Sequence, residues 1–155
     1  YPKVGVVLQA YLKRSIADIE KFAEPGFNAR ICKGIYKENK NIAYQNPEDI
    51  SKNFLSMAEI MLAKNYYACY ATHDLQLIDD LVSLTKEMGA DPSKFEFQVL
   101  YGVPMKGKLK KLLKSGYKVR VYVPYGPDWY EYSLRRLKEN PNIAGYVIKN
   151  LFAKK

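Results

Sequence analysis

Stretches typical of β-strands alternate with stretches typical of helices along the whole chain, and this alternation limits the folds that it can adopt. The expected strands cover residues 4–11, 29–36, 66–72, 95–103 and 118–126, and the expected helices cover 15–24, 46–61, 74–88, 106–116 and 128–141. The second helix opens on Asn46, Pro47, Glu48 and Asp49, a typical combination of cap, proline and acids at a helix start. The alternation predicts a parallel sheet with helices packed against it, either an open doubly wound sheet or a (β/α)8 barrel.

The two faces of the expected strands differ in polarity, which favours the barrel. In an open doubly wound sheet the central strands are apolar on both faces. In 95–103, however, the apolar Phe95 and Phe97 alternate with Glu96 and Gln98, and other strands carry Gln9, Arg30 and Arg120 on one face. Buried polar groups need a partner or a ligand. A barrel of the TIM type with a binding site in its interior satisfies this requirement better than an open sheet does.

The length, composition and charge describe one globular domain with a basic surface. The chain has 155 residues, of which 48% are hydrophobic and 26% charged, and its formal net charge is +9. This charge fits nucleic-acid or membrane-surface binding, but lysines spread along helix faces give the same total. The densest stretch, 106–116, indicates an amphipathic helix with a solvated lysine face, or a patch that faces a membrane or an anion. The single histidine argues against a metal site, and the two cysteines, which both lie in apolar runs, argue against a disulfide framework. No run approaches the ~20 apolar residues of a membrane-spanning helix.

The carboxyl ends of the expected strands, where barrels of this type hold their active sites, are aromatic, cationic and hydrogen-bonding. They contain no paired carboxylates, no Ser/His/Asp arrangement and no glycine-rich phosphate loop, which indicates a large, partly anionic, planar ligand more than hydrolysis. Lys33 has the opposite strand parity from Arg30, so both reach one site only if the strand kinks or ends between them. His73 is expected either to contact a ligand or to bond to the backbone at the start of a helix.

Tyr132, Arg135 and Arg136 share one face of the last expected helix, nearly opposite Leu134 and Leu137. Such a face is either a solvated cationic stripe or a fork for a carboxylate or phosphate, to which planar guanidinium groups bind bidentately. Helical geometry alone leaves both alternatives open.

Five motifs, in their order and spacing, resemble the proline dehydrogenase family of the bacterial type, flavoenzymes that oxidise proline to Δ1-pyrroline-5-carboxylate. They are "RICKGIYKE", "ATHD", "FEFQVLYGV", "KVRVYVPYG" and "YSLRRLKENP", and the resemblance covers nearly the whole chain from "GVVLQAYL" onward. The family fold is a (β/α)8 barrel, and residues 1–155 resemble its C-terminal portion, from the fourth strand through the eighth helix.

The resemblance implies a role for each residue that matches a family motif. Arg30 would lie near the flavin N5 and act in catalysis, since its charge favours the anionic reduced ring. Leu100 and Tyr122 would line the apolar side of the substrate pocket. Tyr132 would cover the proline ring, while Arg135 and Arg136 bind the proline carboxylate. The residues implied to contact FAD are Gln9, Arg30, Lys33, Gly34, Ile35, Thr72 and His73.

The resemblance also implies partners and a location. L-Proline would be the substrate and a membrane quinone the electron acceptor of a cytoplasmic oxidoreductase that contacts the inner face of the cytoplasmic membrane peripherally. The family's lysine and aspartate on earlier strands have no counterpart, and Tyr1 stands directly before a strand, so the chain alone is expected to be inactive and to need the N-terminal half of the barrel. The alternative is a flavin-free module that binds anions or nucleic acid through its charge and 14 tyrosines. Several tyrosines belong to barrel interiors or strand ends, which argues against nucleic acid as a partner.

Overall fold

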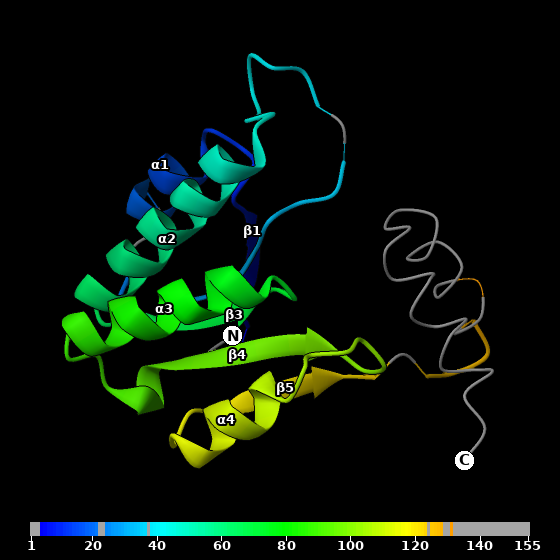
Figure 1. Cartoon of the computed structure of the whole chain (residues 1–155). Coiled ribbons are helices and arrows are strands. Elements are labelled where there is room, and N and C mark those ends of the chain that lie inside the picture. Colours follow the sequence, from blue (N-terminus) through cyan, green and yellow to red (C-terminus); the bar gives the residue numbers. More distant parts are fainter. Residues whose placement is uncertain (1–3, 22–23, 37, 124, 129–130, 132–155) are drawn as a thin grey trace.

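Strands and helices alternate throughout the part of the chain that the structure describes (Figure 1). The structure is a computed structural model, and it describes residues 4–21, 24–36, 38–123, 125–128 and 131. Its strands are β1 (Val6–Gln9), β2 (Asn28–Cys32), β3 (Tyr67–Ala71), β4 (Phe95–Leu100) and β5 (Val119–Tyr122). Its helices are α1 (Ser15–Lys21), α2 (Pro47–Ala63), α3 (Leu75–Glu87) and α4 (Lys108–Lys114), with a short 3-10 turn, η1 (Pro92–Lys94), before β4.

The strands form one parallel sheet in the order β1-β2-β3-β4-β5. Connections between parallel strands are nearly always right-handed, so an order without reversal puts every connecting helix on the same face. A doubly wound sheet reverses its strand order and carries helices on both faces. The sequential order therefore confirms the (β/α) barrel type, with β1 and β5 at the two edges of the described sheet.

The hydrophobic core lies between the sheet and the helices. Alternate strand residues point into it, among them Ile31, Tyr70 and Phe97, each at most 1% exposed. The rings of Tyr70 and Phe97 meet edge to face with centroids 5.6 Å apart, a geometry that contributes ~0.5–1.5 kcal/mol beyond burial. The side chains of α2 and α3 that close this layer are Phe54, Met57, Ala58, Met61, Leu77, Ile78 and Leu81. This packing leaves the opposite face of the sheet available for a site.

Local capping sets the starts of the two long helices. The Asn46 side chain accepts a hydrogen bond of 2.9 Å from the backbone N–H of Glu48, and Pro47 occupies the first turn of α2. Asp74 caps α3 by accepting from the backbone N–H groups of Gln76 and Leu77. Both starts agree with the sequence expectation, because a cap is a contact between residues two or three positions apart.

The strands are shorter than the sequence predicts, since the backbone leaves the sheet soon after each run of alternating residues, whereas α2 continues two residues beyond its predicted end at Met61. Beyond β2, for example, Gly34 adopts a φ of 93°, which no strand tolerates. The predicted helix 106–116 begins at Lys108, because Lys106 and Gly107 have positive φ. Its face is also narrower than predicted, as Leu112 is buried but Leu113 is 58% exposed. Among the described residues, no helix combines the length and hydrophobicity that crossing a membrane requires.

Candidate functional site

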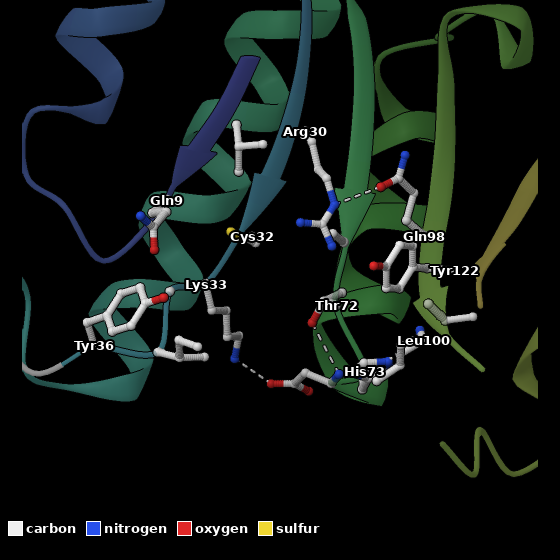
Figure 2. A pocket seen from close by; sticks show the side chains of 16 residues that line it. Gln9, Arg30, Cys32, Lys33, Tyr36, Thr72, His73, Gln98, Leu100 and Tyr122 are labelled. Carbon is white, nitrogen blue, oxygen red and sulfur yellow. Dashed lines mark hydrogen bonds and ion pairs between the residues drawn. The ribbon is translucent and has the colours of Figure 1, made fainter. Parts of the chain in front are cut away.

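A cavity of about 510 Å³ opens at the carboxyl ends of the strands (Figure 2). All of the predicted site residues that the structure describes line it, together with Cys32, Tyr36, Asp74 and Gln98. Those predicted residues are Gln9, Arg30, Lys33, Gly34, Ile35, Thr72, His73, Leu100 and Tyr122. Tyr132, Arg135 and Arg136 lie outside the described residues. Every strand of the described sheet, or the segment directly after it, thus contributes a residue to the lining of this one cavity. The individual roles of these residues stay predictions.

Arg30 reaches the cavity by crossing the neighbouring strand. Its Cα pairs with Cys69 of β3, and Ala71 of β3 pairs with Gln98 of β4. Cys69 and Ala71 have small side chains on this face of β3, which leaves room for the side chain of Arg30 to pass over the strand. The Nε of Arg30 therefore donates a hydrogen bond of 2.9 Å to the Oε1 of Gln98 (Figure 2). The guanidinium is therefore tied at Nε, and its two NH2 groups are not used by this contact.

Glu96, a buried carboxylate, precedes Gln98 by two positions in β4, so its side chain lies on the same face of the sheet. Its side chain is only 5% exposed. Its Oε1 accepts from the amide nitrogen of Gln98 at 2.7 Å and from Nε of Arg120 at 2.5 Å, while Oε2 accepts from Nη2 of Arg120 and the hydroxyl of Tyr67, both at 2.9 Å. Burial alone would raise the pKa of Glu96, but the hydrogen bonds from Arg120, Gln98 and Tyr67 lower it to about 2. Part of the polar strand face is therefore explained by pairing within the protein.

Lys33 enters the cavity because β2 ends before it. The strand stops at Cys32, so the parity that separates Lys33 from Arg30 no longer applies, and Lys33 Nζ lies 2.6 Å from Oδ2 of Asp74. Burial raises the pKa of Asp74, but the hydrogen bond from Lys33 and those from the first turn of α3 more than offset this and leave it lowered. The pairing of Asp74 with Lys33 was not predicted from the sequence. The position of Asp74 at the start of the predicted helix 74–88, directly after "ATH", was a signal that a carboxylate stands at the mouth of the site.

Gly34 packs so closely on Tyr11 that no side chain fits between them. A methyl group at Gly34 would overlap Cδ1 of the Tyr11 ring and lie 2.6 Å from Cε1. The φ of 93° at Gly34 also belongs to a region that L-residues rarely adopt. Gly34 therefore contributes only backbone atoms to the wall of the cavity, and the place that its side chain would take is already occupied by the ring of Tyr11.

His73 accepts a hydrogen bond of 2.9 Å at Nε2 from the backbone N–H of Leu100. Burial lowers the pKa of this imidazole, and the charge of Arg30 lowers it further. The ring is therefore neutral near pH 7, with its proton on Nδ1. His73 does bond to the backbone, but at the end of β4 and not at the start of the helix where the sequence placed the bond, and this bond holds the ring within the lining of the cavity.

The arrangement suits the binding of a large anionic ligand more than acid–base hydrolysis. Arg30 and Lys33 bring two cations to the lining, while Gln9 and Thr72 bring hydrogen-bonding groups. The carboxylate at the mouth, Asp74, is already paired with Lys33 and two backbone amides. General acid–base hydrolysis needs a carboxyl group or a histidine that can exchange a proton with the substrate, but Asp74 is already paired and Nε2 of His73 already accepts from the backbone of Leu100.

Three comparisons with known proteins agree with one another. The sequence matches the family model described as proline dehydrogenase over residues 1–148. It is 40% identical to proline dehydrogenase 1 of Bacillus subtilis (strain 168), an alignment that covers 99% of this chain and 51% of that protein. It is 39% identical to proline dehydrogenase of Deinococcus radiodurans, with 96% of this chain and 47% of that protein covered. The chain therefore spans about half the length of the curated relatives it matches.

The structural comparison points to the same group of proteins. Proline utilization A from Bdellovibrio bacteriovorus, solved in a form inactivated by N-propargylglycine, matches with a TM-score of 0.76 and 26% sequence identity. The match covers 88% of this chain and 16% of that one. The (β/α) arrangement described above is thus shared with a solved relative over most of this chain.

Proposed function

The chain belongs to the proline dehydrogenase family, a family of flavoenzymes, and from that premise we propose that it forms part of the active site of an enzyme that oxidises L-proline to Δ1-pyrroline-5-carboxylate. One observation carries the proposal: the residues implied to contact FAD and those implied to line the apolar side of the substrate pocket meet in a single cavity. FAD, when bound there, would supply the acceptor for the hydride that leaves proline.

The residues present fit such a cofactor. Gly34 presents only backbone atoms to a ligand in the cavity. Lys33 and Arg30 provide the cations that a phosphate-bearing and electron-rich ligand requires, and Lys33 is held in place by Asp74. Gln9, Thr72 and His73 add polar groups around the rim, and Ile35 adds an apolar contact. In this proposal, Arg30 acts in catalysis by bringing a positive charge close to the flavin.

The substrate would lie against Leu100 and Tyr122, which line the same cavity. The proposed partners of its carboxylate are Arg135 and Arg136, with Tyr132 covering the ring; all three lie outside the described residues. Fixing the carboxylate would set the orientation of the proline ring, and positioning of this kind supplies much of the rate in hydride transfer.

The electron acceptor, the location and the remaining barrel strands are part of the same proposal. A membrane quinone would take the electrons from a cytoplasmic enzyme bound peripherally to the membrane. Support comes from the net charge of +9 and from the exposed Lys110, Lys111 and Lys114 of α4, which an anionic surface would attract. That the chain needs the N-terminal half of the barrel for activity stays a prediction.

The test compares the full-length protein with the 155-residue chain. With FAD and proline, the full-length protein is expected to show flavin absorbance near 450 nm and to reduce a dye in a proline-dependent manner, whereas the 155-residue chain is expected to show no turnover. Turnover by the chain alone would refute the need for further strands. Absence of flavin, combined with salt-sensitive binding of a random oligonucleotide, would instead support the flavin-free alternative and refute the proposal.

A further inference from the structure

A continuous row of hydrogen bonds links the buried carboxylate of Glu96 to Arg30. Glu96 Oε1 accepts from the amide nitrogen of Gln98 at 2.7 Å, and the Oε1 of Gln98 accepts from Nε of Arg30 at 2.9 Å. The row runs from the interior of β4 to the lining of the cavity. The same carboxylate also accepts hydrogen bonds from Arg120, at both oxygens, and from Tyr67, at Oε2.

The chemistry of the two ends fixes the orientation of the amide between them. An ionised carboxylate only accepts hydrogen bonds, so Gln98 must turn its NH2 group toward Glu96. Its oxygen then faces Arg30, whose guanidinium only donates. If the amide were reversed, an oxygen would face the carboxylate and an NH2 group would face the cation, so both contacts would become repulsive.

Arg120 fixes the orientation of the carboxylate itself. It donates from Nε to Oε1 and from Nη2 to Oε2 of Glu96, whose side chain is 5% exposed. The carboxylate therefore cannot rotate away from Gln98 without breaking this bidentate pair, whether or not Tyr67 is bonded to it. Arg30 has a long side chain with many rotamers, and Gln98 is the side chain that the described part of the protein supplies to hold its Nε.

We propose that Glu96 is a positioning residue of the flavin site and fixes the guanidinium of Arg30 through the side-chain amide of Gln98. This inference rests on the proposed function, because it gives the held guanidinium its place beside the flavin. A fixed cation there stabilises added negative charge on the ring, whereas a cation that wanders among rotamers does so less.

The test uses Gln98→Met in the flavin-loaded holoenzyme, a change that removes both hydrogen bonds of the amide but leaves Glu96 paired with Arg120 and Tyr67. The flavin midpoint potential, measured without proline, is expected to move to a more negative value. The rate of anaerobic flavin reduction at saturating proline is expected to fall by about tenfold, the scale of one lost hydrogen bond to a charged group. Gln98→Asn, which keeps the amide but shortens the side chain, is the second variant if Gln98→Met fails to fold, and its expected shifts have the same sign.

Tyr67→Phe is the matched control, since it removes a donor from the same carboxylate without touching the row to Arg30. Its midpoint potential and reduction rate are expected to stay at the wild-type values. Unchanged values in the Gln98 variants, or equal shifts in Tyr67→Phe, would overturn the positioning role while leaving the proposed function intact. A wild-type holoenzyme that bound no flavin would overturn both.

Discussion

Replacing Gly34 by alanine is expected to lower the free energy of unfolding by about 2–5 kcal/mol, because two separate costs add. The first is the backbone: at a φ of 93°, a side chain meets its own peptide group, which costs ~1–2 kcal/mol. The second is the overlap of the new methyl group with the ring of Tyr11, and overpacking of this kind costs ~1–3 kcal/mol.

The second cost is expected in full because Tyr11 cannot move aside easily. Its side chain is buried, with the residue 6% exposed. Its backbone N–H donates to the carbonyl of Lys33 at 2.9 Å, and its own carbonyl accepts from the N–H of Tyr44 at 2.8 Å. The backbone of Tyr11 is therefore anchored on both sides, so the ring can yield only by rotating its side chain within a buried site.

Gly102→Ala separates the two costs. Gly102 has nearly the same backbone angle, a φ of 85°, but an added methyl group would meet nothing within 4 Å. Urea unfolding of both variants is expected to show a loss of ~1–2 kcal/mol for Gly102→Ala and a clearly larger loss for Gly34→Ala. Flavin bound per protein is expected to fall only for Gly34→Ala. If the two losses agreed within about 0.5 kcal/mol, the usual limit of such comparisons, the argument from ring overlap would be wrong.

Three further predictions concern charges. The pKa of Glu96 is lowered from 4.5 to about 2, so its stabilisation is complete above pH 4.5 and is lost as the pH falls toward 2. Because the side chain of Arg120 is 66% exposed, solvent screening limits the stabilisation from this carboxylate to ~1–2 kcal/mol. It can be measured as the difference in free energy of unfolding between wild type and Glu96→Gln along a pH series. A difference that did not change with pH would contradict the prediction. Arg30→Met is expected to retain flavin but to slow its reduction by proline in stopped-flow measurements, and unaltered kinetics would remove Arg30 from the mechanism. Arg135→Ala or Arg136→Ala is expected to raise the KM for proline by the equivalent of ~2–4 kcal/mol, and a change under twofold would refute a carboxylate clamp.

The architecture was predictable from the sequence because it depends on patterns of short range. Polarity that alternates with a period of two residues distinguished the face of Phe97 from that of Gln98, and this difference favoured the barrel before the strand order was known. The cap at Asn46 was predictable for the same reason, since it bonds to a residue two positions away.

The pairing inside the site was not predictable in this way. Arg120 and Tyr67 bond to Glu96 from positions 24 and 29 residues distant, and Lys33 meets Asp74 across 41 residues. Such contacts follow from strand register and from where each strand ends, which local spacing does not encode. The sequence could therefore identify polar positions on the sheet but not which of them neutralise one another.

Asp74 bonds both to Lys33 in the site and to backbone amides of α3, and this links the site to the hydrogen exchange of those amides. One carboxylate holds Lys33 and also accepts from the N–H groups of Gln76 and Leu77. Those amides are shielded only while the first turn of α3 stays closed, and opening of that turn would also release Lys33. A ligand that binds Lys33 and Asp74 in their paired arrangement would consequently slow deuterium uptake at Gln76 and Leu77, so that the first turn of α3 acts as a built-in reporter of occupancy.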